Sequence, residues 1–181
     1  DFANYYASCL ETSGLEGAVP SGRGIVVVVP PWNFPYAIPA SGILAGLMAG
    51  NAVILKPAPE AVLTGWILAQ HLWRAGVPRE VLQFVPCPDN EIGQSLVSDP
   101  RVSVVVLTGA HSTGKMFQGW RPQMRLFAET SGKNSLIITA AADQDLAVKD
   151  LVRSAFGHAG QKCSAASLAI LACLMWGTAT P

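Results

Sequence analysis

Short runs of apolar, mostly β-branched residues recur along this sequence. The first, residues 24–30, carries an isoleucine followed by four valines and ends at Pro30. A run without alternation of polar and apolar residues is typical of a strand buried on both faces, as in a parallel sheet. Comparable runs follow at residues 52–55, 81–85, 102–107 and 136–138.

The stretches between these runs have the composition and spacing of helices. Residues 37–50 are rich in alanine, leucine and glycine, and residues 61–75 and 143–155 carry apolar residues at helical spacing. We expect the end of a helix and a loop in residues 1–17, and a loop with a short helix in residues 89–97. The alternation predicts an α/β protein with a doubly wound, mostly parallel, Rossmann-like sheet of about five strands.

Composition narrows the class of protein further. The 181 residues are 50% hydrophobic and 13% charged, which suits a buried core of one domain or slightly more. Lys and Arg number 12, as do Asp and Glu, so charge gives no reason to expect a nucleic-acid partner. The four cysteines, Cys9, Cys87, Cys163 and Cys173, form no C-x-x-C pair, and nothing at the start resembles a signal peptide. We therefore expect a reducing, cytoplasmic setting and no transmembrane segment, since residues 165–177 fall short of the about 20 that a helix needs.

Two polar residues come shortly after predicted strands. Asn33 lies in the rigid segment Pro-Trp-Asn-Phe-Pro at residues 31–35, and Lys56 follows the run at residues 52–55. The carboxyl ends of strands are where α/β sheets bind ligands, so Asn33 could face a ligand and Lys56 could reach a ribose or phosphate oxygen. The alternatives are an asparagine that satisfies its own turn and a solvated surface lysine.

A third candidate lies after the run at residues 102–107. Residues 109–115, from Gly109 to Lys115, read G-x-x-x-x-G-K, which is close to a phosphate-binding P-loop. Met116 stands where that motif needs a serine or threonine for magnesium. A P-loop-type nucleotide-binding module therefore stays an alternative to a helix N-terminus that lies beside a pyrophosphate.

Candidate catalytic groups occur late in the chain. Cys163 lies among glycines and small residues at positions 156–165, where a thiolate could attack a carbonyl and backbone N–H groups could hold the oxyanion. Glu129 precedes a turn of small residues and could act as a general base. A buried core cysteine and a helix-capping or surface glutamate are the alternatives.

Five stretches occur in an order and spacing that resemble the aldehyde dehydrogenase superfamily: residues 31–35, 55–58, 107–109 with Gly114, 128–134 and 160–163. Residues 82–87 and 154–165 are most similar to the glutamate-semialdehyde (Δ1-pyrroline-5-carboxylate) dehydrogenase module of bifunctional proline utilization A proteins. The resemblance implies an aldehyde dehydrogenase-like fold and an aldehyde substrate, L-glutamate γ-semialdehyde, oxidised to L-glutamate in proline catabolism.

The resemblance also implies roles for individual residues. Cys163 would be the nucleophile, the Asn33 amide with the Cys163 backbone N–H would hold the oxyanion, and Glu129 would activate the hydrolytic water. The cofactor would be NAD, with NADP possible, and Lys56 would bind its adenosine ribose. The cofactor-binding set implied is Pro31, Trp32, Asn33, Lys56, Ala58, Gly93, Thr108, Gly109, Gly114 and Glu129. Pro59 and Ala110 depart from the pattern of many relatives and leave the choice between NAD and NADP open.

By the same resemblance, residues 1–132 would be an NAD-binding domain and residues 133–181 the start of a catalytic domain. After Leu171 the pattern is lost, so we expect a piece of a longer protein with little turnover of its own. A non-catalytic remnant that still binds NAD is the alternative. The full-length family member would be a homo-oligomer, and a proline dehydrogenase domain could be fused to it.

Overall fold

A computed structural model describes residues 1–12, 17, 19 and 21–172, and Cys173 lies outside them. The chain divides into two compact units, Asp1–Thr130 and Ser131–Pro181. This division lies near the expected boundary at residue 132, and the roles assigned to the two domains stay predictions. Each unit is described by itself below.

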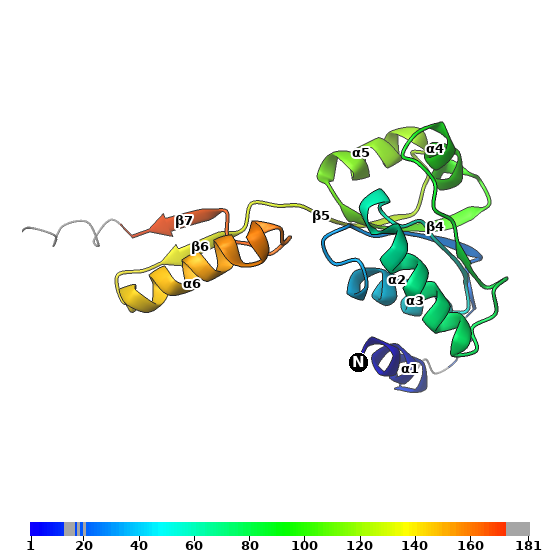
Figure 1. Cartoon of the computed structure of the whole chain (residues 1–181), viewed down its shortest axis with the longest axis horizontal. Helices are drawn as coiled ribbons and strands as arrows, with labels where there is room; N and C mark the ends of the chain where they lie inside the picture. Colours follow the sequence, from blue (N-terminus) through cyan, green and yellow to red (C-terminus); the bar gives the residue numbers. More distant parts are fainter. Residues whose placement is uncertain (13–16, 18, 20, 173–181) are drawn as a thin grey trace, which may run out of the picture. The chain divides into compact units, whose positions relative to one another are not determined.

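The first unit is built on a five-stranded parallel sheet in the order β3-β2-β1-β4-β5 (Figure 1). Its strands are β1 (Ile25–Val29), β2 (Ala52–Leu55), β3 (Leu82–Phe84), β4 (Val102–Gly109) and β5 (Leu126–Thr130). The helices of the unit are α1 (Phe2–Thr12), α2 (Ala37–Met48), the short η1 (Pro59–Ala61), α3 (Val62–Arg74), α4 (Glu91–Ser98) and α5 (His111–Trp120). This arrangement confirms the predicted α/β fold with a parallel sheet.

The β-branched run of β1 supplies side chains to both faces of the sheet, and each face has its own core. Val26 and Val28 pack on the side of α2 and α3, in a cluster that contains Ile43 and Leu68. On the opposite side a second cluster contains Val27 and Val29 of β1, Val97 of α4 and Phe117 of α5. Figure 1 shows these two pairs of helices on opposite sides of the sheet. Successive residues of a strand point to opposite faces, so an uninterrupted apolar run is what a sheet covered on both sides requires.

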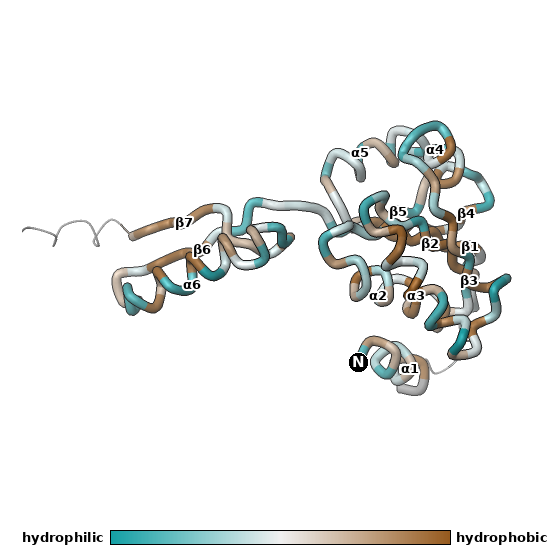
Figure 2. The backbone as a smooth tube through the Cα atoms, in the orientation of Figure 1, coloured by the Kyte–Doolittle hydropathy of each residue, from teal (hydrophilic) through white to brown (hydrophobic). Residues whose placement is uncertain are grey.

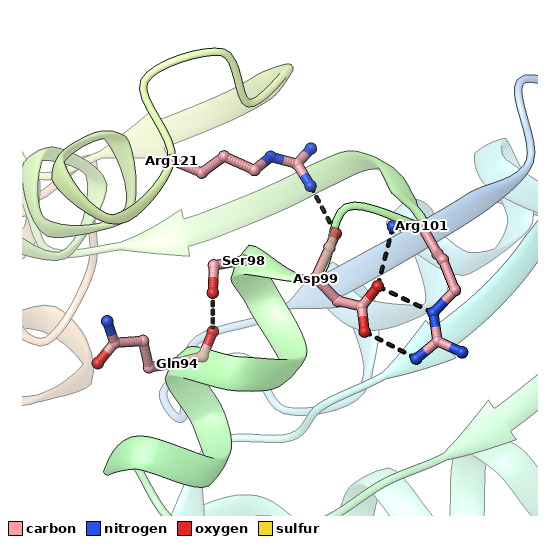
Figure 3. A network of polar contacts seen from close by, with 5 residues as sticks. All are labelled: Gln94, Ser98, Asp99, Arg101 and Arg121. Carbon is pink, nitrogen blue, oxygen red and sulfur yellow. Dashed lines mark hydrogen bonds and ion pairs between the residues drawn. The ribbon is translucent and has the colours of Figure 1, made fainter.

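The amino-terminal end of β4 is tied to the helices before and after it by a polar network (Figure 3). Arg101 donates from Nε and Nη2 to the two carboxylate oxygens of Asp99, at 2.9 and 2.7 Å. Arg121, which follows α5, donates to the backbone carbonyls of Asp99 at 2.5 Å and Val102 at 2.7 Å. The hydrogen bonds from the Arg101 side chain and backbone lower the pKa of the Asp99 carboxyl to about 2.

The second unit is a βαβ element. Strand β6 (Ser135–Ile138) leads through α6 (Gln144–Phe156) and the short helix η2 (Gly157–Gly160) to β7 (Leu168–Leu171). The strands pair in parallel, and the carboxylate of Asp143 caps α6 by accepting from the Leu146 N–H at 3.0 Å. Figure 2 shows apolar residues along β6 and β7.

Two strand assignments differ from the sequence prediction. The run at residues 136–138 is a strand, but it pairs with β7 in a separate sheet instead of extending the five-stranded one. The fifth strand of that sheet is β5, where Phe127 is exposed and Glu129 interrupts the apolar pattern. Because β5 lies at the edge of the sheet, burial constrains its sequence less than that of β1.

Candidate functional site

The order of the strands fixes where a ligand could bind in the first unit. From β1 the chain adds β2 and β3 toward one edge of the sheet, then crosses back to add β4 and β5 on the other side of β1. The connections that leave β1 and β4 therefore run in opposite directions. In a doubly wound sheet this reversal opens a crevice outside the carboxyl ends of the strands. Val29 pairs with Leu107 in the register, which places the segments that follow β1 and β4 at the same edge.

Three of the predicted residues lie in the segment between β1 and α2. Pro31 and Asn33 are half-buried there and Trp32 is exposed. Two prolines, at positions 31 and 35, restrict the backbone of this segment, and helix α2 begins immediately afterwards at Ala37. Asn33 therefore lies at the carboxyl edge, as predicted from its place after β1; its role toward an oxyanion stays a prediction.

The predicted residues at the end of β4 are brought together with Glu129. Thr108 pairs with Glu129, and Gly109 with Thr130, in the parallel register of β4 and β5. Glu129 is an exposed strand residue, so the alternative of a helix-capping glutamate is wrong, whereas that of a surface glutamate stays open. Its exposed position leaves the carboxylate accessible to water or to a ligand.

Helix α5 begins at His111, so Ala110 alone separates it from β4. Residues 111–115 are helical and Lys115 is exposed, whereas a P-loop needs a glycine-rich loop to wrap around phosphates. The P-loop alternative is therefore wrong. The first turn of α5 has no acidic residue and no side-chain cap, and this suits a phosphate at the helix N-terminus. Gly114 is buried in this helix, where an added Cβ would lie 3.7 Å from Thr130 Cγ2.

Lys56 directly follows β2, and its backbone N–H donates to the carbonyl of Val28 at 3.0 Å. Its side chain is only 4% exposed, so the alternative of a solvated surface lysine is wrong. The ammonium forms an ion pair with the carboxylate of Asp89, whose side chain is 63% exposed. A buried cation is costly without such a partner. Sequence reasoning missed Asp89, since nothing in the local pattern links it to a lysine 33 positions earlier.

The remaining predicted cofactor residues flank Lys56. Ala58 is half-buried and precedes η1. Gly93 is a buried residue of α4, and a Cβ added there would lie 2.7 Å from the Pro88 carbonyl oxygen and 3.4 Å from Lys56 Cε. Glycine therefore allows α4 to approach Pro88 and the Lys56 side chain closely.

In the second unit, Cys163 lies between η2 and β7. Cys163 is exposed, so the alternative of a buried core cysteine is wrong. The side-chain amide of Asn134 donates to the backbone carbonyl of Cys163 and, at 3.1 Å, to that of Ala165. The Asn134 carbonyl accepts from the N–H of Leu168 at 3.1 Å.

The segment before Cys163 has an unusual backbone. His158, Ala159 and Gly160 have φ values of 57°, 55° and 71°, in the left-handed region. For the two residues that are not glycine, such a conformation costs about 1 kcal/mol or more each. At Gly160 a Cβ would lie 2.9 Å from the Ala155 carbonyl oxygen. The left-handed turn leads the chain away from the end of α6, and the Asn134 hydrogen bonds hold the segment beyond it.

The supporting roles of Asn134 and Ser154 were not predicted either, although both residues lie in stretches that carry the family resemblance. The Ser154 hydroxyl accepts from the N–H of Ala166 at 3.1 Å, which gives the Cys163 segment a second support. The position of Asn134 one residue before β6 was the available signal, since polar residues at strand ends often bind neighbouring loops. Cys163 belongs to one unit and Asn33 and Glu129 to the other. Their convergence at one active site stays a prediction.

In the part of the chain that the structure describes, no group of three His, Cys, Asp or Glu side chains could hold a metal ion. Within the same residues, no helix is both long enough and apolar enough to span a membrane.

Comparison with known proteins places these features in a family. The chain is 43% identical over 160 residues to 1-pyrroline-5-carboxylate dehydrogenase of Staphylococcus saprophyticus, a match that covers 84% of this chain and 31% of that protein. It is 40% identical over 156 residues to the enzyme of the same name from Geobacillus thermodenitrificans, covering 82% of this chain and 30% of that one. The chain thus spans about a third of the length of these curated relatives.

Solved structures match as well. Proline utilization A (PutA) from Corynebacterium freiburgense superposes with a TM-score of 0.87 at 48% identity, over 94% of this chain and 18% of that one. A variant of Thermus thermophilus 1-pyrroline-5-carboxylate dehydrogenase superposes with a TM-score of 0.82 at 33% identity, over 95% of this chain and 37% of that one. The sequence pattern of the aldehyde dehydrogenase family matches residues 15–176, and with its parallel sheet this chain belongs to that family.

Proposed function

We propose that this chain carries the cofactor-binding region and the nucleophile of an NAD(P)-dependent aldehyde dehydrogenase, with L-glutamate γ-semialdehyde as the substrate. The observation that carries the proposal is the exposed, free Cys163 on a segment held by Asn134. The substrate is inferred from relatives named 1-pyrroline-5-carboxylate dehydrogenase, at 40–43% identity.

The proposed reaction uses one cysteine, one amide and one carboxylate. The Cys163 thiolate attacks the aldehyde carbon to give a thiohemiacetal, whose oxyanion accepts hydrogen bonds from the Asn33 amide and the Cys163 N–H. NAD, when bound, accepts the hydride that leaves this carbon. Glu129 then takes a proton from the water that hydrolyses the resulting thioester and frees the thiol. An aldehyde, water and NAD⁺ thereby give a carboxylic acid, NADH and a proton.

The residues at the carboxyl edge of the sheet fit a dinucleotide. Lys56 is a buried cation at the end of β2, where it can donate to a ribose hydroxyl. The uncapped start of α5 can receive a pyrophosphate, and Thr108 and Gly109 precede it on β4. Pro31, Trp32 and Ala58 follow β1 and β2 at the same edge. For the full-length protein we propose a cytoplasmic homo-oligomer, with proline dehydrogenase as a possible fused source of substrate.

Turnover can be tested in a complete protein framework. The matching segment of the Staphylococcus saprophyticus relative would be replaced by this chain, and NADH formation from glutamate γ-semialdehyde measured by absorbance. Cys163→Ala should abolish the signal, because no thioester can form. Glu129→Gln should retain a burst of up to one NADH per site but lower the steady-state rate roughly 10²-fold or more, since hydrolysis loses its base.

The outcomes separate the alternatives. A chimera that folds, binds NAD and forms no NADH would support a non-catalytic cofactor-binding remnant. A rate unaffected by Cys163→Ala would contradict the proposed chemistry. Circular dichroism of each variant distinguishes a lost reaction from a lost fold.

A further inference from the structure

The ion pair between Lys56 and Asp89 joins two connections at the carboxyl edge of the sheet. Strand β2 ends at Leu55, next to Lys56, and β3 pairs with it in parallel through Leu55 and Phe84. Asp89 lies beyond β3, immediately before the N-cap residue of α4. The two side chains therefore lie at the edge where a doubly wound sheet binds its ligands.

The two partners differ in exposure. The Lys56 side chain is 4% exposed and the Asp89 side chain 63%. Burial and the ion pair fix the ammonium, while the carboxylate presents acceptor positions to solvent. An accessible carboxylate beside a fixed cation is an arrangement that a ligand can approach without displacing the buried charge.

This arrangement matches a ribose that carries free hydroxyl groups. The ammonium can donate to one hydroxyl oxygen, and the carboxylate can accept from a hydroxyl O–H. A phosphate on the 2′ oxygen would instead bring negative charge against Asp89 and remove the hydroxyl that it accepts from. In the standard dinucleotide-binding motif an acidic side chain hydrogen-bonds the ribose 2′-hydroxyl of NAD, whereas a nearby arginine accommodates the 2′-phosphate of NADP. Asp89 offers the same carboxylate chemistry from a different connection, the one that follows β3.

We propose that Asp89 is a specificity-determining residue that accepts a hydrogen bond from the adenosine ribose of NAD and disfavours NADP. This inference rests on the cofactor site of the proposed function. Asp89 would favour NAD over NADP, and it is not among the cofactor-binding residues that the family resemblance implies. Glu91, the first residue of α4, is also acidic but does not pair with Lys56 among the described contacts, so it serves as a matched control.

Calorimetric titration of the 181-residue chain with NAD and with NADP tests the inference without requiring turnover. The unaltered chain should bind NAD at least about tenfold more tightly than NADP, because one hydrogen bond to a charged group changes an affinity by about that factor. Asp89→Asn keeps an oxygen that accepts from Lys56 but removes the charge, so it should reduce this ratio at least about fivefold. Glu91→Gln should leave the ratio within about twofold.

Asp89→Glu is a second variant, in case the asparagine variant does not fold, and it should retain the preference for NAD because the charge remains. An NADP preference in the unaltered chain, an unchanged ratio in Asp89→Asn, or an equal effect of Glu91→Gln would overturn the role of Asp89. In those cases the cofactor site itself would stand. If neither dinucleotide binds, the cofactor site and the role of Asp89 both fall.

Discussion

Replacing Asn134 by alanine should loosen the segment that carries Cys163 while leaving the backbone of β6 intact. The substitution removes the two hydrogen bonds that the side-chain amide donates to the carbonyls of Cys163 and Ala165. Each is worth about 0.5–1.5 kcal/mol net, so the free energy of local opening should fall by about 2 kcal/mol. That corresponds to an increase of about 30-fold in the opening equilibrium.

Hydrogen exchange at individual amides can measure this change. The amides of Ser167 and Leu168 donate to the Asn134 carbonyl, an acceptor that alanine also provides, so they report the stability of the segment and not the loss of their own partner. Their exchange should accelerate about 30-fold in Asn134→Ala. Asn134→Asp should have a larger effect, because carboxylate oxygens would then face two carbonyl oxygens.

A matched control is available in the first unit. Asn90 caps α4 by accepting from the Ile92 N–H at 2.9 Å, and Asn90→Ala is the same chemical change in another place. It should leave the exchange of Ser167 and Leu168 unaltered. If Asn134→Ala changes these rates by less than twofold, or if Asn90→Ala accelerates them equally, Asn134 does not hold the Cys163 segment.

Three further predictions concern stability. Ile43→Ala should lower the free energy of unfolding by about 2–5 kcal/mol, because Ile43 of α2 is fully buried against the sheet. Urea denaturation measures this change, and a loss below about 1 kcal/mol would contradict the packing. Gly93→Ala should lower the free energy of unfolding by about 1–2 kcal/mol, because the added Cβ would lie 2.7 Å from the Pro88 carbonyl oxygen. Gly119→Ala in α5 is the control: its Cβ would have no atom within 4 Å, so this change should be neutral or stabilise the fold by up to about 1 kcal/mol. Equal effects of the two substitutions in thermal melts would refute the steric argument. The pKa of Asp99 is lowered from 3.8 to about 2 in the folded state, so its stabilising contribution is complete only above about pH 5 and is lost as the pH falls through about 2. The difference in unfolding free energy between the unaltered chain and Asp99→Asn should therefore shrink on acidification, and a difference that grows would show the wrong sign.

The sequence alone predicted the elements whose burial follows one pattern along their whole length. The run of β1 is apolar at every position because both faces of the sheet are covered, and this local pattern predicts a buried parallel strand. The place of Asn33 and Lys56 after strands predicted their positions at the carboxyl edge in the same way. In each case the signal lies within a few consecutive residues.

The tertiary structure decided the contacts between residues far apart along the chain. Strand β5 has an exposed phenylalanine and a glutamate, and only its pairing with β4 defines it as a strand of the sheet. The buried ammonium of Lys56 pairs with Asp89 from the loop beyond β3, and Asn134, which directly precedes β6, holds the Cys163 segment. The local sequence encodes backbone preferences and the spacing of buried residues along an element. The residue that pairs with a charged group or hydrogen-bonds a carbonyl depends on which segments the fold brings side by side.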